Sequence, residues 1–103
     1  MATIINITDK IKNEEKFIAY NGKTYKVDDS KNTIMRVYAL LGKDGGSATV
    51  ESIDAILKEL IGKDAVKDFS NFTYEDYLVP FFAAMACVQG KTYEEVERSF
   101  RES

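Results

Sequence analysis

The dipeptide Asn21-Gly22 constrains the fold of this chain more than any other feature of its sequence. It separates two short runs of strand-forming residues, which end at residue 20 and resume at residue 23. A type I′ turn requires positive φ at both central residues, and Asn-Gly is the pair that tolerates this conformation best. The sequence therefore predicts a two-residue β-hairpin over about residues 15–27.

This turn also determines which residues of the two strands face each other. The expected cross-strand pairs are Tyr20 with Lys23, Ala19 with Thr24, Ile18 with Tyr25 and Phe17 with Lys26. The more apolar face, which we expect to pack on the rest of the domain, carries Ile18, Tyr20, Tyr25 and Val27. Because an isolated hairpin is only marginally stable, this face must lie on helices or on a third strand, for which residues 3–8 are a candidate.

Beyond residue 27 the apolar residues recur with the period of an α-helix. We expect helices over about residues 31–41, 49–61, 64–69, 74–89 and 93–101. Gly42 is expected to end the first helix as its C′ residue. Pro80 should kink or break the fourth helix, because proline lacks the N–H that bonds to the preceding turn. Thr92 and Glu95 form a capping box at the start of the last helix.

The first two expected helices each carry an apolar stripe for the core. These stripes contain Ile34, Val37, Tyr38, Leu41, Val50, Ile53, Ile56, Leu57, Leu60 and Ile61. A length of 103 residues with 45% apolar and 30% charged side chains is typical of one globular domain. The sequence therefore predicts a single α+β domain over residues 1–103, mostly α, in which an N-terminal β-hairpin packs on a bundle of four to five short helices.

The composition argues against several classes of site. The chain has no histidine, which is the commonest general base and metal ligand, and its single cysteine permits no intramolecular disulfide. Cys87 lies in an apolar run and is interpreted as a small core side chain, not a nucleophile. The 14 basic and 17 acidic residues give a net charge of −3, which argues against nucleic-acid binding. We therefore expect no catalytic site, no cofactor and no metal.

Three further patterns have weak similarity to ligand sites. The glycine-rich stretch 42–47 follows a helix and has its lysine in the wrong place for a phosphate-binding loop, so it is interpreted as a connector. The adjacent carboxylates at positions 14–15 and 28–29 are interpreted as surface and capping residues, because sequence neighbours do not project together. Asp64 and Asp68 are four residues apart, but no EF-hand spacing surrounds them.

The chain also lacks targeting patterns. The three isoleucines near its beginning are interrupted by polar residues, unlike the apolar stretch of a secretory signal. The longest nearly apolar run, residues 78–88, is much shorter than the ~20 residues that cross a bilayer. We therefore expect a cytoplasmic protein that makes no contact with a membrane.

Charge is unevenly distributed along the sequence. Residues 1–46 hold 8 basic and 6 acidic side chains, whereas residues 47–103 hold 6 basic and 11 acidic ones, so a +2 half precedes a −5 half. One interpretation is that the acidic residues occupy solvated helix faces and first turns, where the helix dipole favours them. The other is that oppositely charged ends attract neighbouring copies head to tail, which predicts a homo-oligomer that weakens in salt.

The expected helix 74–89 carries more aromatic residues than one buried stripe needs. Tyr74, Tyr77, Phe81 and Phe82 are these residues. Either two faces of the helix are buried in the domain, or one face is kept for a partner. We take all four as candidate partner-binding residues, with Tyr77 and Phe81 the foremost.

Several of these features together resemble the tail assembly chaperones of long-tailed phages and prophages of Gram-positive bacteria. The resemblance extends from about residue 14 to residue 101 and includes the hairpin 17–27, the helix that ends at Leu41-Gly42, the segment 72–86 and the end 90–100. It implies a non-enzymatic protein of the bacterial host cytoplasm. Such chaperones bind the long helical tape measure protein during tail assembly and help tail tube subunits to polymerise around it.

Two alternatives remain open at the level of sequence. One is another virion or assembly component of similar size, such as a head–tail connector protein. The other is a small helix-turn-helix regulator, whose recognition helix should carry exposed Arg, Lys, Asn or Gln. Residues 74–89 hold only Gln89 of these types, which disfavours the regulator.

Overall fold

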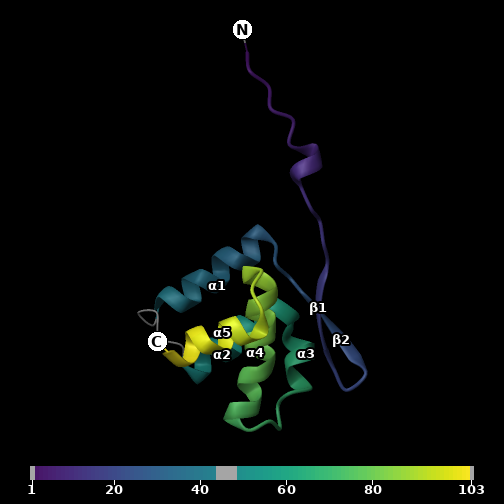
Figure 1. Ribbon diagram of the computed structural model, residues 1–103. Coiled ribbons are helices and arrows are strands. Elements are labelled where there is room, and N and C mark those ends of the chain that lie inside the picture. The colour runs from purple at the N-terminus through teal and green to yellow at the C-terminus, as the bar shows by residue number, and fades with distance from the viewer. Residues whose placement is uncertain (1, 44–48, 103) are drawn as a thin grey trace.

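The structure is a computed structural model that describes residues 2–43 and 49–102 (Figure 1). In this part of the chain an N-terminal hairpin precedes five α-helices, so the fold is α+β and mostly α, as predicted. The elements are η1 (Thr8–Lys10), β1 (Lys16–Tyr20), β2 (Lys23–Val27), α1 (Lys31–Lys43), α2 (Val50–Ile61), α3 (Lys63–Lys67), α4 (Tyr74–Gln89) and α5 (Tyr93–Glu102). Most of the predicted connector at residues 42–47 lies outside the described residues.

The hairpin has the register that its turn predicts. Asn21 and Gly22 adopt φ values of 52° and 81°, and β1 pairs with β2 antiparallel in all four predicted pairs. Tyr25 and Val27 are buried against the helices. Tyr20 lies on the same face but keeps 46% of its surface exposed, because it lies beside the turn at the end of the hairpin.

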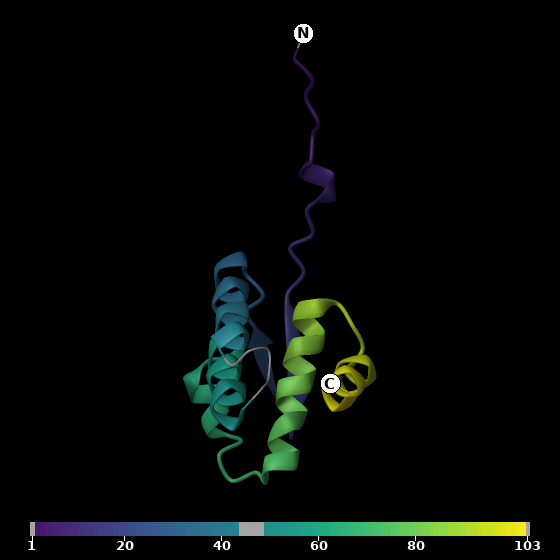
Figure 2. The same ribbon diagram turned by 90° about the vertical axis from the view of Figure 1, so that its left-hand side faces the viewer.

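The expected third strand over residues 3–8 is wrong. Residues 2–14 form an arm, the N-terminal arm, that projects away from the helices in both views (Figures 1 and 2). Local hydrogen bonds fold part of the arm into η1, since the Thr8 N–H donates to Asn6 Oδ1 (3.0 Å) and the Lys10 N–H donates to the Ile7 carbonyl (2.9 Å). The only sheet of the described residues is therefore two-stranded.

Helix α1 begins at a small side-chain network and extends beyond its predicted end. Asp28 accepts hydrogen bonds from the Ser30 N–H (3.0 Å) and from Thr33 Oγ1 (2.7 Å), which orders the turn between β2 and α1. Gly42 does not end the helix, because it has no left-handed backbone and the helix continues through it to Lys43. Tyr38, which was expected in the core, is 51% exposed, so the buried stripe of α1 is narrower than predicted.

Helix α2 begins and ends where the sequence predicts. Thr49 accepts a hydrogen bond from the Ser52 N–H (3.1 Å) as its N-cap, and Gly62 ends the helix with a φ of 94°. Val50 was expected in the core but is 56% exposed. As the first residue of α2, it precedes the buried stripe that begins at Ile53.

Helix α4 is continuous from Tyr74 to Gln89 and contains Pro80, so the predicted break does not occur. The helix begins at the predicted Thr73 cap and ends at Gly90, which is left-handed with a φ of 65°. The capping box before α5 is also confirmed. Glu95 Oε1 accepts from the Thr92 N–H at 3.0 Å, and Thr92 Oγ1 accepts from the Glu95 N–H at 3.1 Å.

The core lies around α4, which has other elements on two sides (Figure 2). Helices α1 and α2 lie on one side of it and α5 lies on the other, while the hairpin also packs against α4 and α2. The largest fully buried side chains are Phe82, Ile53, Ile56, Leu57, Leu60, Leu78, Val27, Val37 and Thr33. Because α4 is buried on two sides, it needs apolar residues around more of its circumference than a surface helix does.

Candidate functional site

The aromatic residues of α4 divide into a buried pair and an accessible pair. Phe81 and Phe82 are only 4% and 0% exposed. Their rings contact α5, with 5.1 Å between the ring centroids of Phe82 and Phe100 and 5.8 Å between those of Phe82 and Tyr93. The prediction that Phe81 and Phe82 face a partner is thereby corrected, because α5 covers them and they form part of the core.

Tyr74 and Tyr77 line a surface groove where the start of α4 approaches α2 and α3. We call it the tyrosine groove; its volume is about 620 Å³. Its apolar lining consists of Val50, Val66, Phe69, Phe72, Tyr74 and Tyr77. Tyr74 and Val50 are 47% and 56% exposed, so the groove presents accessible apolar surface beside a well-packed floor. These two tyrosines remain the candidates for partner contact.

The hydroxyl of Tyr77 is held in a charged network on the wall of this groove. It donates to Asp54 Oδ1 at 2.6 Å, a length typical of a hydrogen bond to a carboxylate. The other oxygen of Asp54 lies 2.8 Å from Lys58 Nζ. Lys58 and then Tyr77 lower the pKa of the Asp54 carboxyl below its ordinary value. Burial, reinforced by the bond to Asp54, raises the pKa of Tyr77 well above that of a free tyrosine.

The rim of the tyrosine groove is cationic. Lys58, Lys63 and Lys67 line it together with one carboxylate, that of Asp54. An apolar floor between lysines fits an amphipathic helix whose apolar stripe is flanked by acidic residues. The groove can therefore bind such a helix by apolar contact, with the lysines providing long-range attraction.

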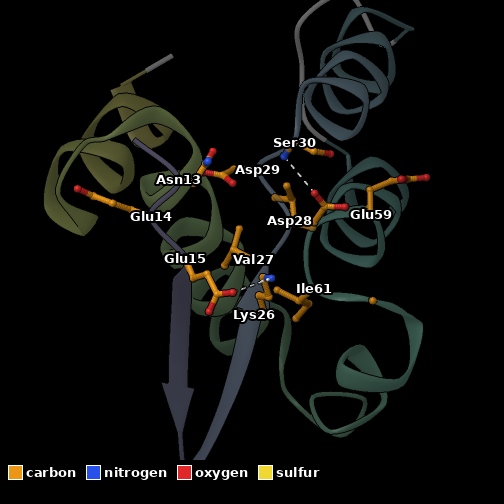
Figure 3. A pocket seen from close by; sticks show the side chains of 12 residues that line it. Asn13, Glu14, Glu15, Lys26, Val27, Asp28, Asp29, Ser30, Glu59 and Ile61 are labelled. Atoms are coloured by element: carbon orange, nitrogen blue, oxygen red, sulfur yellow. Dashed lines mark hydrogen bonds and ion pairs between the residues drawn. The ribbon is translucent and has the colours of Figure 1, made fainter. Parts of the chain in front are cut away.

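A second hollow, of about 770 Å³, lies where the hairpin meets the end of α2 and the start of α1 (Figure 3). It is lined by five carboxylates: those of Glu14, Glu15, Asp28, Asp29 and Glu59. Four of them have partners. Asp28 caps the turn before α1, and the other three pair with Lys26 (Glu15, 3.4 Å), Lys16 (Asp29, 3.3 Å) and Arg36 (Glu59, 2.8 Å).

This pairing explains why the hollow does not resemble a metal site. Hydrogen bonds from Thr33 and then Ser30 lower the pKa of Asp28. Both oxygens of this carboxylate therefore already accept hydrogen bonds from neighbouring residues. Within residues 2–43 and 49–102, no group of three or more candidate ligands is placed to hold a metal ion. Asp64 and Asp68 also point to different partners, since Asp68 accepts from the Tyr25 hydroxyl at 2.8 Å and Asp64 pairs with Lys67.

Cys87 lies at the end of α4, where its carbonyl is bound by the hairpin. Lys16 Nζ donates to the Cys87 carbonyl oxygen at 2.8 Å, which places a cation at the negative end of the α4 dipole. Burial raises the pKa of the Cys87 thiol. A raised pKa is the opposite of what an activated nucleophile requires.

The sequence reasoning missed the aromatic residues that follow α3. The sequence places Phe69 at the end of the expected helix 64–69 and assigns no contact to Phe72, but both residues line the tyrosine groove. Phe69 is 2% exposed, and its ring centroid lies 5.7 Å from that of Tyr20 and 5.3 Å from that of Phe72. Two aromatic residues on either side of Ser70-Asn71 were the available signal, because an ordinary surface loop seldom carries such a pair.

None of the helices in the described part of the chain combines the length and the apolar character that crossing a bilayer requires. Comparison of the chain with models of protein families, with curated proteins and with solved structures finds no match in any of the three.

Proposed function

We propose that this chain is a non-enzymatic tail assembly chaperone of a long-tailed phage or prophage, and that it binds the tape measure protein in the tyrosine groove. Two independent lines support the proposal. One is the resemblance of its sequence to that class of chaperone. The other is the accessible apolar groove, rimmed by lysines, into which Tyr74 and Val50 project.

The groove is the observation that carries the mechanism. A tape measure protein is long and helical, and an unassembled helix of this kind exposes an apolar stripe that promotes aggregation. A chaperone needs a surface that covers part of that stripe without enclosing it. The tyrosine groove offers such a surface, because its lining includes the buried Phe69, whose ring contacts that of Phe72.

When many copies bind along one long partner, each single contact needs only a low affinity. Each groove can bind weakly, since neighbouring copies on the same partner raise the effective concentration of the next. The lysines on the rim favour stretches with acidic residues beside the apolar stripe, and salt should weaken this preference. Contact with tail tube subunits belongs to the same proposal, with no surface assigned to it.

The test is co-expression with the tape measure protein of the same gene neighbourhood, followed by measurement of its soluble fraction and by pull-down. The groove variant carries Val50→Glu and Tyr74→Ala, two residues about half exposed, so that the fold is retained. A matched control carries Met35→Glu and Tyr38→Ala on α1, which are 62% and 51% exposed and lie outside the groove. Circular dichroism verifies that both variants are folded.

Wild type and control should keep the tape measure protein soluble, and the groove variant should bind it about tenfold more weakly or worse, since aromatic anchors dominate such interfaces. Wild type that leaves the tape measure protein insoluble and unbound would refute the function. Normal binding by the groove variant would refute only the assignment of the site.

A further inference from the structure

The N-terminal arm presents apolar side chains that nothing in the described structure covers. Ile4, Ile5, Ile7 and Ile11 are 88%, 74%, 56% and 56% exposed. The run from Thr3 to Thr8 is rich in β-branched residues, which favour strands. A sequence suited to a strand is thus held outside any sheet, which suggests that its partner strand lies in another molecule.

The hairpin has a free edge that matches this segment. The two-residue turn makes Tyr20 and Lys23 a hydrogen-bonded pair, so Phe17 and Ala19 direct their N–H and C=O groups away from β2. Those groups have no hydrogen-bond partner among the described residues. Exposed edge strands of this kind readily accept an added strand.

An apolar groove of about 310 Å³ runs beside that edge, between β1 and the first half of α4. We call it the edge groove; it is lined by Ile18, Ala19 and Tyr20 of β1, by Asp76, Val79, Pro80 and Ala83 of α4, and by Phe69 and Phe72. Val79 is 48% exposed although it lies on the most apolar helix. A third strand beside β1 would cover it.

We propose that the arm of one copy adds to β1 of a second copy as a third, antiparallel strand, with the arms exchanged reciprocally. Residues alternate in a strand, so Ile5 and Ile7 enter the edge groove while Ile4 lies on the outer face, where Phe17 is 49% exposed. Six residues span ~20 Å, which matches the length of the five-residue β1. This inference does not depend on the function proposed above.

The second copy, and not the same chain, supplies the strand. The arm leaves the body at the start of β1 and points away from the turn of the hairpin (Figure 1). The edge groove is lined by Ile18, Ala19 and Tyr20, the last three residues of β1. Residues 11–15 contain no turn that would reverse its direction. Each copy has one arm and one edge groove, so in a reciprocal exchange each arm occupies the groove of the other copy, as in domain swapping.

Charge favours the antiparallel direction. β1 begins beside the end of α4, where Lys16 contacts the Cys87 carbonyl, and it ends beside Asp76 and Val79. An antiparallel arm therefore places its Lys10 and Lys12 near the start of β1. Five carboxylates line the hollow there, and three of them form ion pairs within the chain (Figure 3). The opposite direction would place those lysines at the other end of β1, where the edge groove has one carboxylate, that of Asp76.

The first test measures the mass of the purified full chain by sedimentation over a dilution series. We expect a species of at least twice the 11.6 kDa monomer that dissociates on dilution. Ile5→Asp and Val79→Lys should each weaken association about a hundredfold or more, because each replaces an apolar side chain of the proposed interface with a charged one. The matched controls Asn6→Asp, on the opposite face of the added strand, and Met35→Lys, on α1, should leave it within a fewfold of wild type.

A disulfide trap then identifies the contact. In a Cys87→Ala background, a chain with Ile5→Cys is mixed with one carrying Ala83→Cys, and oxidation should produce the mixed disulfide dimer, whereas Asn6→Cys should not. A monomer at every concentration, or association that Ile5→Asp and Val79→Lys leave intact, would overturn the proposal. So would a disulfide that forms within one chain when both cysteines are present at high dilution, because the arm would then fold back on its own β1.

Discussion

The hydrogen bond between Tyr77 and Asp54 allows the sharpest prediction about stability. Replacing Tyr77 with Phe removes one oxygen and leaves the ring packed in the groove wall, so the change isolates the 2.6 Å bond to Asp54. A net hydrogen bond to a charged group contributes ~1.5–3 kcal/mol. The Asp54 side chain is 37% exposed and keeps Lys58, so water can replace part of the lost bond. We therefore expect a loss of about 1–2 kcal/mol in the free energy of unfolding.

Urea unfolding followed by circular dichroism measures this loss at neutral pH, and thermal unfolding should show a Tm lower by about 4–8 °C per kcal/mol. Tyr74→Phe is the matched control. The Tyr74 hydroxyl has no hydrogen bond among the described residues and its side chain is 47% exposed, so this change should cost less than ~0.5 kcal/mol. Equal stabilities for the two variants would refute the reasoning.

The pH dependence provides a second check on the same bond. The pKa of Asp54 is lowered in the folded protein, so the stabilisation by its ionised form is present above the unfolded value of about 3.9. That contribution is lost as the pH falls through the lowered pKa. The stability difference between wild type and Tyr77→Phe should therefore shrink in acid. A difference that stays constant from neutral pH into acid would contradict the assignment of a charged acceptor.

Three further changes test the core, a helix cap and the turn before α1. Leu57 is 0% exposed, and Leu57→Ala should reduce the free energy of unfolding by ~2–5 kcal/mol, as measured in urea. Thr92→Ala removes the hydroxyl that accepts from the Glu95 N–H but keeps the backbone N–H that donates to Glu95, and it should cost about 1 kcal/mol, with the loss of α5 protection visible in hydrogen exchange. Asp28→Asn should destabilise the chain at neutral pH but little in strong acid, because the contribution of the Asp28 carboxylate is complete above about pH 4 and is lost as the pH falls through its lowered pKa.

Local signals in the sequence were sufficient for most of the fold. The hairpin register followed from Asn21-Gly22, and the caps at Thr73 and Thr92 located the last two helices, since each of these signals acts over three or four residues. The predictions failed where a residue is compatible with more than one local conformation. Gly42 can end a helix but can also be included in one.

The candidate site was harder to predict, because burial depends on which elements meet. Tyr74, Tyr77, Phe81 and Phe82 share one helix, and their spacing alone does not reveal that α5 covers the last two. The strand preference of residues 3–8 likewise predicted a third strand within the chain, and this strand does not form. The structure leaves that segment without a partner strand among the described residues.

The two proposed contacts meet at a single aromatic pair. Phe69 and Phe72 line the tyrosine groove on one side and the edge groove on the other. Substitution of either phenylalanine would therefore disturb partner binding and self-association together and could not separate them. Val50 and Val79 each line one groove alone, and both are about half exposed. If the two grooves act independently, the variant with Val50→Glu and Tyr74→Ala should lose tape measure binding and keep its oligomeric mass. The variant with Val79→Lys should dissociate to monomers, and each monomer should still bind the tape measure protein.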